Sequence, residues 1–225
     1  MLFRSDPHLQ TLIEKALNNN PDLLNAALNV DIAEQQVKAA KLSFLPSVVF
    51  APTGTISHFG THTSSTQSYS LPVSASWEID LFGKLRSSKK AAQMTMIQAQ
   101  DYKVYAQTTL ISSVANLYYT LLMLDRQKQI VDDMLGLTKN TWDVMKLQME
   151  FGRARSTSVQ SAEAAFYSVQ TQAADIRRQI RETENTLSLL LGEPAQTIAR
   201  GSLDNQSLPA NFAGGIGVQL LSNRA

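Results

Sequence analysis

The stretch Tyr69-Ser70-Leu71-Pro72-Val73-Ser74-Ala75-Ser76-Trp77-Glu78-Ile79-Asp80 alternates apolar residues with small or polar ones almost without interruption. Successive side chains of a strand point to opposite faces, so the run predicts a strand with one apolar and one polar face. Its length matches the roughly 9 to 11 residues with which a tilted strand crosses a bilayer. The same alternation also occurs in a half-buried strand of a soluble sheet, so the neighbouring sequence has to distinguish a membrane strand from a soluble one.

A second candidate strand precedes this one. Residues 47–60 are rich in strand-forming side chains, and the residues that follow, 61–67, are polar. We therefore predict a transmembrane β-hairpin over residues 47–82, with an external loop near residues 60–67. Apolar residues of the second strand are predicted to face the membrane: Tyr69, Leu71, Val73, Trp77 and Ile79.

Two further features bear on this hairpin. Tyr69 and Trp77 lie near opposite ends of the second strand, where a membrane barrel places amphipathic rings at its two interfaces. Pro52 and Pro72 cannot donate hydrogen bonds to the ladder, so we expect bulges or irregular pairing there. A two-stranded hairpin cannot close a barrel, so other chains or further sequence must complete it.

The composition excludes several classes of protein. No apolar run approaches the roughly 18 residues of a transmembrane helix, so any crossing must be made by strands. The chain has 20 basic and 19 acidic residues, which gives no electrostatic reason to bind nucleic acid. Cysteine is absent, which excludes disulfides and thiolate metal sites within these residues. Residues 1–6 lack the features of a signal peptide, so an exported protein would begin upstream of Met1.

Two helices are expected before the hairpin. Asp6-Pro7 and Asn20-Pro21 each place a capping residue before a proline, which suits the first position of a helix. The first helix should run to about Asn18. The second should continue to Leu45, where the following Pro46 disfavours helical geometry.

A much longer helical hairpin is expected after the strands. From Lys84 to about Glu150 the chain has no proline, and a helix of this length extends about 100 Å at 1.5 Å per residue. A turn follows at residues 151–156, and Thr157-Ser158-Val159-Gln160 fits a capping box that begins a returning helix. In both helices apolar residues step by threes and fours, which predicts coiled-coil faces and a long antiparallel hairpin over residues 83–191. The first face contains Val114, Leu117, Leu121, Leu124, Lys128, Val131, Leu135, Thr138, Trp142, Met145 and Met149, of which only Lys128 and Thr138 interrupt the apolar pattern. The second face contains Val159, Ala162, Phe166, Val169, Ala173, Ile176, Ile180, Thr183, Leu187 and Leu190.

Several short motifs resemble those of a known family. Residues 20–27 (NPDLLNAA) are similar to its NP-x-L-x-A segment, and Leu45-Pro46 to its entry into the first strand. Residues 77–84 (WEIDLFGK) are similar to its W-x-x-D-x-F-G-K/R junction between barrel and helix. Residues 189–194 (LLLGEP) are similar to its LLG-x-P close of the first repeat, and residues 220–225 to the start of the segment that opens the second. The order of elements and these motifs resemble the N-terminal half of a TolC-like outer membrane factor, also called an outer membrane efflux protein, of the RND-type, NodT-like lipoprotein branch.

The resemblance implies a mostly α fold with a β-hairpin, in which long antiparallel coiled-coil helices accompany two strands of an oligomeric transmembrane β-barrel. Residues 1–46 would be a short helix and the first periplasmic helix, and residues 83–191 the helical hairpin of the periplasmic tunnel. Residues 192–225 would be an equatorial linker and the start of a truncated second repeat. Family members supply four strands and two helical hairpins per protomer, so we expect this fragment alone to trimerise poorly.

The function implied by the resemblance is that of an outer-membrane channel component of a tripartite efflux or export system. Such a channel is a passive exit duct in the bacterial outer membrane that extends into the periplasm. Its implied partners are two further copies in a homotrimer when full length, a periplasmic adaptor, an inner-membrane pump and outer-membrane lipid. Lipid-anchored members carry an N-terminal cysteine, and this sequence has none, so lipidation stays open. The exported substrate is set by the pump and is not given by the sequence.

Two groups of residues would carry functional roles. By resemblance, the turn Gly152, Arg153, Ala154, Arg155 and Ser156 lies at the periplasmic tip, where adaptors dock and where the helices open and shut. The alternative is a plain connector, in which glycine permits a left-handed backbone and the arginines aid solubility. Family members often have an acidic residue near the position of Ser158, which leaves any gating ion pair at that position in doubt.

The other group lies at the junction between barrel and helix. It comprises Asp80, Phe82 and Gly83, which would shape the turn from strand to helix. A carboxylate at Asp80 is favoured near the N-terminus of the new helix. These roles are structural.

No arrangement of residues indicates catalysis, a cofactor or a metal. His58 and His62 straddle a strand end and a loop, which favours a surface interpretation over a metal site. Asp132-Asp133 is interpreted as a solvated helix face. The alternative function is a periplasmic coiled-coil adaptor or a helical scaffold, which would also contain a long helical hairpin. The alternating strand pair favours the duct.

Overall fold

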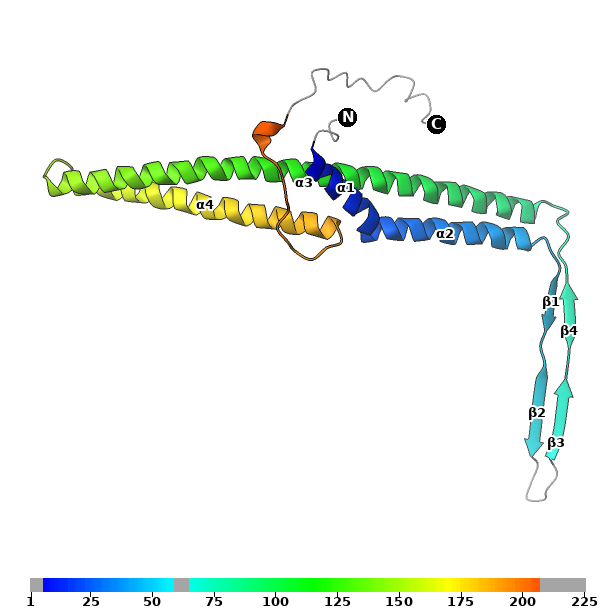
Figure 1. The fold of residues 1–225 in the computed structure, drawn as a ribbon. Coiled ribbons are helices and arrows are strands. Elements are labelled where there is room, and N and C mark those ends of the chain that lie inside the picture. Colours follow the sequence, from blue (N-terminus) through cyan, green and yellow to red (C-terminus); the bar gives the residue numbers. More distant parts are fainter. Residues whose placement is uncertain (1–5, 59–64, 207–225) are drawn as a thin grey trace, which may run out of the picture. The chain divides into compact units, whose positions relative to one another are not determined.

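The computed structural model describes residues 6–58 and 65–206, and Figure 1 shows its elements in chain order. The helices are α1 (Pro7–Asn19), α2 (Pro21–Leu42), α3 (Lys84–Glu150) and α4 (Ser156–Leu190), followed by the short 3-10 helix η2 (Leu203–Asn205). The strands are β1 (Ser47–Phe50), β2 (Thr53–His58), β3 (Ser65–Ser70) and β4 (Val73–Ser76). The predicted fold class, mostly α with one β-hairpin and a long antiparallel helix pair, is confirmed.

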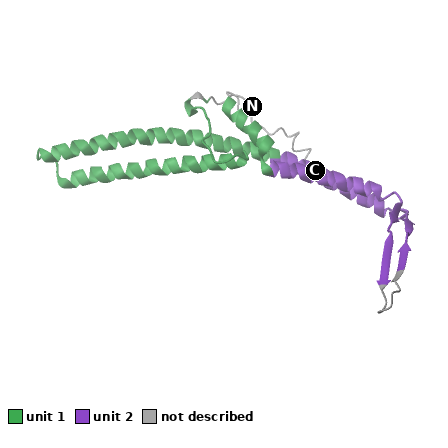
Figure 2. Cartoon of the chain, turned by 60° about the horizontal axis from the view of Figure 1, so that its bottom comes forward, with its two compact units in different colours: residues 1–21, 107–225 green, residues 22–106 purple. Residues whose placement is uncertain are grey.

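The chain divides into two compact units, which Figure 2 colours separately. One unit comprises residues 1–21 and 107–225, and the other comprises residues 22–106. The boundary falls within α3, so the first part of this helix shares a unit with α2 and the strands. Within the described ranges, no helix combines the length and the apolarity that a membrane span requires.

The helix α2 is shorter than predicted. It ends at Leu42, and the prediction that it continues to Leu45 is wrong. The N–H of Leu45 donates to the carbonyl of Leu42 over 2.9 Å, three residues back, so the chain tightens into a turn. The residue before Pro46 is disfavoured in the helical region, which explains why the helix stops short of the proline.

The helices α3 and α4 lie side by side and antiparallel in Figure 1, as the coiled-coil pattern predicts. Every predicted seam residue of α4, from Val159 to Leu190, is buried or half-buried. In α3 the same holds for the predicted seam from Val114 to Met145, whereas Met149 is 41% exposed. The seam is therefore confirmed, and it loosens towards the turn between the helices.

The turn between α3 and α4 is built around a glycine. Gly152 has a φ of +70°, and its N–H donates to the carbonyl of Met149 over 2.9 Å. The N–H of Arg153 donates to the carbonyl of Gln148 over 2.8 Å, which completes a typical glycine-ended helix terminus.

The helix α4 does not begin as predicted. Arg155 occupies the N-cap position and makes no side-chain capping hydrogen bond. Its carbonyl accepts hydrogen bonds from the N–H groups of Ser158 and Val159, so Thr157 already lies inside the helix. The predicted capping box is therefore wrong.

The two pairs of strands follow one continuous register. Phe50 lies opposite Val73 and Thr53 opposite Ser70, so two residues on each strand separate the ladders. Each gap contains a proline, Pro52 or Pro72, which has no N–H to donate. The predicted irregular pairing is confirmed. The alternative of a bulge is wrong, because a bulge would shift the register by one residue and the register is unchanged.

The strand β4 ends earlier than the alternating pattern predicts. The pattern continues to Asp80, but β4 ends at Ser76. Its partner β1 begins only at Ser47, directly after Pro46, so Trp77 has no paired residue opposite it. Trp77 and Ile79 therefore lie beyond the paired strands.

Candidate functional site

The register sorts the side chains of the hairpin onto two chemically different faces. Residues directly opposite each other in an antiparallel pair lie on the same face, and alternate residues change face. Over residues 48–56 and 67–75, one face is apolar apart from a single glutamine: Val48, Phe50, Pro52, Gly54, Ile56, Gln67, Tyr69, Leu71, Val73 and Ala75. The other face is rich in hydroxyl groups: Ser47, Val49, Ala51, Thr53, Thr55, Ser57, Ser68, Ser70, Pro72, Ser74 and Ser76.

The apolar face is exposed. Phe50 is 59% exposed, Ile56 is 62% exposed and Leu71 is 70% exposed. Tyr69, Leu71 and Val73, three of the predicted membrane-facing residues, share this face with residues of the first strand that the sequence alone did not align with them. A continuous exposed apolar surface marks a site of interaction with lipid or protein.

Tyr69 packs across the hairpin onto a glycine. Gly54 lies directly opposite Tyr69, and a β-carbon at Gly54 would come within 3.2 Å of the tyrosine ring. The ring therefore covers the space that a side chain at Gly54 would occupy, a packing known to support strand glycines. This contact holds the ring against the apolar face.

The other two predicted membrane-facing residues lie in the irregular segment after β4. Trp77 and Ile79 are 63% and 61% exposed. The indole N–H of Trp77 donates to the carbonyl of Phe44 over 3.2 Å, which ties the end of one side of the hairpin to the start of the other.

The predicted junction residues have distinct geometries. The Asp80 carboxylate accepts hydrogen bonds from the backbone N–H of Arg86 over 3.0 Å and from its guanidinium over 3.2 Å. It thereby caps the first turn of α3, as expected for a carboxylate at a helix N-terminus. Gly83 has a φ of +79°, which favours glycine at the strand-to-helix turn. Phe82 is 99% exposed and packs on no described residue of the junction.

The predicted tip residues lie in the turn between α3 and α4. Arg153 and Arg155 are exposed, and Ala154 is half-buried between them. The turn is closed by backbone hydrogen bonds at Gly152, so the arginine side chains are not needed to hold it. Both guanidinium groups are therefore available to a partner.

A charged cluster that no sequence motif predicted joins the two long helices. Arg200, in the segment after α4, donates to Asp125 on α3 through two nitrogens, one over 2.9 Å, and to Glu184 on α4 over 2.5 Å. The side chain of Arg200 is 13% exposed and that of Glu184 is 9% exposed. Hydrogen bonds to Asp125, opposed by burial, raise the pKa of Arg200 above its ordinary value, so the guanidinium stays charged.

A second missed cluster surrounds the cap of α1. Asp6 accepts hydrogen bonds from the N–H of His8 over 2.9 Å, from the amide of Gln206 over 2.8 Å and from the hydroxyl of Tyr118. The N–H of Gly201 donates to the same hydroxyl over 3.2 Å. Asp6 therefore caps α1, as predicted, and also joins α1 to α3 and to the segment after α4.

The protonation states in this cluster favour its hydrogen bonds. Burial, together with the hydrogen bond to the Asp6 carboxylate, raises the pKa of Tyr118 to about 12. Burial opposes ionisation of Asp6, but hydrogen bonds from Tyr118, Gln206 and His8 outweigh it and lower the pKa of Asp6. At neutral pH the hydroxyl is protonated and the carboxylate is ionised, which is the donor–acceptor arrangement that the geometry shows.

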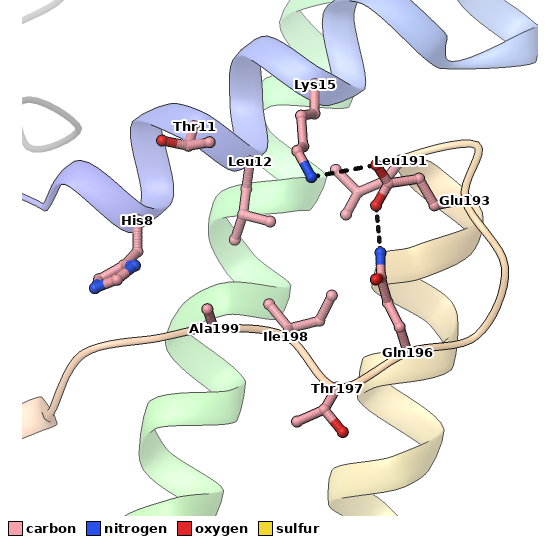
Figure 3. A pocket seen from close by; sticks show the side chains of 10 residues that line it. All are labelled: His8, Thr11, Leu12, Lys15, Leu191, Glu193, Gln196, Thr197, Ile198 and Ala199. Carbon is pink, nitrogen blue, oxygen red and sulfur yellow. Dashed lines mark hydrogen bonds and ion pairs between the residues drawn. The ribbon is translucent and has the colours of Figure 1, made fainter.

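A pocket of about 220 Å³ lies between α1 and the segment after α4, as Figure 3 shows. Lys15 pairs with Glu193 over 3.2 Å, and the amide of Gln196 donates to the same carboxylate. The charged groups of the pocket therefore neutralise each other. We assign the pocket to the packing of α1 and not to ligand binding.

Some of the predicted residues lie outside the described ranges. They are His62 in the expected external loop and the expected start of a second repeat at residues 220–225. Among the described residues, no group of three or more histidine, cysteine or acidic side chains could hold a metal ion.

The sequence is similar to the profile of one protein family and to individual proteins with related names. A sequence profile of the family described as "Outer membrane efflux protein" matches residues 12–193. The probable efflux pump outer membrane protein TtgC of Pseudomonas putida is 29% identical over 99% of this chain and 48% of its own length. The cation efflux system protein CusC of Escherichia coli is 26% identical over 96% of this chain and 49% of its own length. The chain thus spans about half the length of the curated relatives it matches.

Solved structures agree with this comparison. The open state of the Neisseria gonorrhoeae outer membrane channel MtrE superimposes with a TM-score of 0.77 at 25% identity, covering 97% of this chain and 50% of that chain. A membrane protein from Pseudomonas aeruginosa superimposes with a TM-score of 0.82 at 23% identity, covering 99% of this chain and 53% of that chain. At 23% identity, the likeness to the Pseudomonas aeruginosa protein shows only that the fold is similar.

Proposed function

This chain belongs to the outer membrane efflux protein family, and from that membership we propose that it forms part of a passive exit duct in the bacterial outer membrane. The duct would serve a tripartite efflux or export system and extend into the periplasm. An inner-membrane pump would drive export, and a periplasmic adaptor would couple the pump to the duct.

The observation that carries this proposal is the two-faced hairpin. Its apolar face includes residues from both strands and is exposed, whereas its other face is polar. Strands of a membrane barrel alternate in this way, with apolar side chains towards lipid and polar side chains towards the interior. A coiled-coil adaptor or scaffold would have no use for an exposed apolar strand face, so the duct is the better-supported function.

The proposed assignment of segments follows the same plan. Residues 47–82 would form the transmembrane hairpin, and residues 83–191 would form part of the periplasmic tunnel. Residues 1–46 would contribute a short helix and the first periplasmic helix, and residues 192–225 the equatorial linker and the start of a second repeat. Since a hairpin leaves unpaired strand edges that lipid cannot satisfy, the barrel would be completed by the rest of the protein and by two further copies in a homotrimer. We propose no catalytic role or cofactor.

The tip turn is the proposed docking site of the adaptor. Arg153 and Arg155 are exposed at the closed turn and can form charge-assisted hydrogen bonds with carboxylates of a partner. Replacing both by Glu in the full-length protein should reduce cross-linking to the adaptor severalfold and leave the trimer intact. Unchanged cross-linking would assign the turn to the role of a plain connector.

The membrane assignment of the hairpin can be tested with one charge on each face. Val73 lies on the apolar face midway between Tyr69 and Trp77, and Ser74 lies on the other face. An arginine facing lipid near the middle of the bilayer costs about 2–4 kcal/mol. We expect V73R in the full-length protein to lower recovery of heat-labile trimer from outer membranes by tenfold or more, measured by gel migration with and without boiling.

The matched control is S74R, which adds the same side chain one residue along. It should leave recovery of the trimer within about twofold of the unmodified protein, because its charge would face water. Equal loss in both variants would indicate a general folding defect. Equal tolerance of both would contradict the membrane assignment.

A further inference from the structure

Basic residues gather at the base of the strand hairpin, on the ends of the two helices that flank it. Residues 38–42, which end α2, include two lysines, and residues 84–90, which begin α3, include three lysines and one arginine. Both helix ends belong to the same compact unit, and Figures 1 and 2 show them side by side. We call these six residues the basic collar: Lys38, Lys41, Lys84, Arg86, Lys89 and Lys90.

The basic collar borders an uncharged part of the chain. Residues 42–77 contain no Asp, Glu, Lys or Arg. Between residues 35 and 100 the only charged residues besides the collar are Glu78 and Asp80, so six basic residues face two acidic ones, although the net charge of the whole chain is only +1. Positive charge is therefore concentrated where the proposed membrane strands give way to helices.

Salt bridges neutralise only part of the basic collar. The ammonium group of Lys84 pairs with Glu78 over 2.9 Å, and the guanidinium of Arg86 pairs with Asp80 over 3.2 Å. Within the described ranges, no salt bridge involves the other four members, of which three are exposed and one, Lys89, is half-buried. Four cations of the collar are therefore available to an anion outside the chain.

The stability of α3 does not explain the position of its basic residues. A helix N-terminus has a partial positive charge, which disfavours cations close to it. The first turn of α3 nevertheless contains Lys84 and Arg86 and no acidic residue, and Lys89 and Lys90 follow in the next turn. Only Lys41, in the last turn of α2, lies where the helix dipole favours a cation. The basic start of α3 therefore needs a reason beyond helix stability.

Exposed apolar side chains lie next to the basic collar. Trp77 is 63% exposed, Leu81 is 76% exposed and Phe82 is 99% exposed. Aromatic and aliphatic side chains beside lysine and arginine are typical of surfaces that lie at the level of lipid headgroups. At 1.5 Å per residue, residues 84–90 extend over about 9 Å, close to the depth of about 5–8 Å of one headgroup layer. The cations of α3 can therefore reach a single layer of phosphate groups.

From these observations, and resting on the proposed function, we infer that the basic collar binds the phosphate groups of anionic phospholipids in the leaflet that faces the periplasm. Lysine and arginine form charge-assisted hydrogen bonds with phosphate, and each basic residue near an anionic bilayer adds to the attraction. The exposed apolar side chains beside the collar would enter the same interface. The collar therefore gives this part of the membrane surface a preference for anionic over zwitterionic lipid.

Trp77 serves as a natural reporter of lipid beside the basic collar. Its indole lies at the base of the hairpin, where it donates to the carbonyl of Phe44. The full-length protein, with Trp77 as its only tryptophan, would be placed in phosphatidylcholine bilayers that contain a small fraction of lipid brominated near the headgroup, which quenches tryptophan on contact. We expect brominated phosphatidylglycerol, which is anionic, to associate about fivefold more strongly than brominated phosphatidylcholine. This preference should fall below about twofold in about 1 M salt, which screens charge beyond about 3 Å.

The variant K38Q/K41Q/K89Q/K90Q removes the four cations that lie outside the salt bridges. We expect it to lower the preference for phosphatidylglycerol to about twofold or less. Each half of this variant, K38Q/K41Q or K89Q/K90Q, should give an intermediate value, so the test does not depend on the folding of one variant. The matched control K103Q/K139Q changes the net charge as much as each half, at two lysines further along α3, and should leave the preference unchanged.

The same measurement separates this inference from the proposed function. Equal quenching of the unmodified protein by both lipids would refute the basic collar as a lipid site and leave the duct intact, because the hairpin would still contact the bilayer. A preference that survives in the four-lysine variant would also refute the inference, because other residues would then bind the lipid. If neither lipid quenches Trp77, the hairpin does not lie in the bilayer, and the proposed duct fails together with the inference.

Discussion

Replacing Arg200 by Met is expected to destabilise the region where the segment after α4 crosses α3 and α4. Arg200 is the cation that faces both Asp125 and Glu184, and Glu184 is almost fully buried. Removing one partner of a buried ion pair leaves an uncompensated charge and costs about 3–5 kcal/mol. We expect the lower end of this range, because Asp125 is 34% exposed and water can solvate it.

Hydrogen exchange on the full-length protein would measure this effect locally. A loss of about 3 kcal/mol corresponds to exchange more than a hundredfold faster, in peptides that cover residues 121–128 of α3 and 180–188 of α4. The double variant R200M/E184M removes the buried charge together with its partner and should recover most of the loss. If the double variant exchanges as fast as R200M, the cluster stabilises the helices through packing and not through charge.

The second large effect is expected at Gly192, where α4 ends. Gly192 has a φ of +66°, and a β-carbon there would lie 2.6 Å from the backbone carbonyl oxygen of Asn19 at the end of α1. The left-handed backbone costs a non-glycine residue about 1–2 kcal/mol. The clash with a backbone atom forces a further shift, which typically costs about 1–3 kcal/mol. We expect G192A to lower the local stability around α1 and the end of α4 by about 3 kcal/mol.

Two other glycines serve as matched controls for G192A. Gly152 has a φ of +70° but open space around it, so G152A should cost only the backbone strain of about 1–2 kcal/mol. Gly136 lies inside α3 with open space around it, so G136A should stabilise the helix by up to about 1 kcal/mol. Hydrogen exchange of the peptides around each site would rank the three variants. Equal effects of G192A and G152A would show that α1 does not pack closely on Gly192.

Much of the candidate site could be predicted from local sequence. The apolar face of the second strand follows from alternation between Tyr69 and Ile79, because side chains of a strand alternate by geometry. The seams of α3 and α4 follow from steps of three and four, because a helix repeats every 3.6 residues. The cap at Asp80 and the turn at Gly152 likewise depend on residues close in sequence.

Some predictions were wrong because a partner distant in sequence decided the outcome, and others because neighbouring residues formed a different local structure. The alternating pattern continues past Ser76, but the strand ends there because its partner strand begins only at Ser47. The sequence predicted that pairing is interrupted at Pro52 and Pro72. That the strand register is the same on both sides of the interruption could be seen only in the structure, where the two strands are aligned. The residue types at 157–160 match a capping box, but α4 begins two residues earlier, with Arg155 at the N-cap.

The sequence by itself determined the class of the fold, the seams of the helices, the polarity of the second strand and the family. These features depend on periodicity and on short motifs, which are properties of neighbouring residues. Only the tertiary structure decided the alignment of the two strand faces, the link of Arg200 to Asp125 across 75 positions and that of Tyr118 to Asp6 across 112. Such contacts depend on which segments meet in space, and no local pattern along the chain encodes that choice.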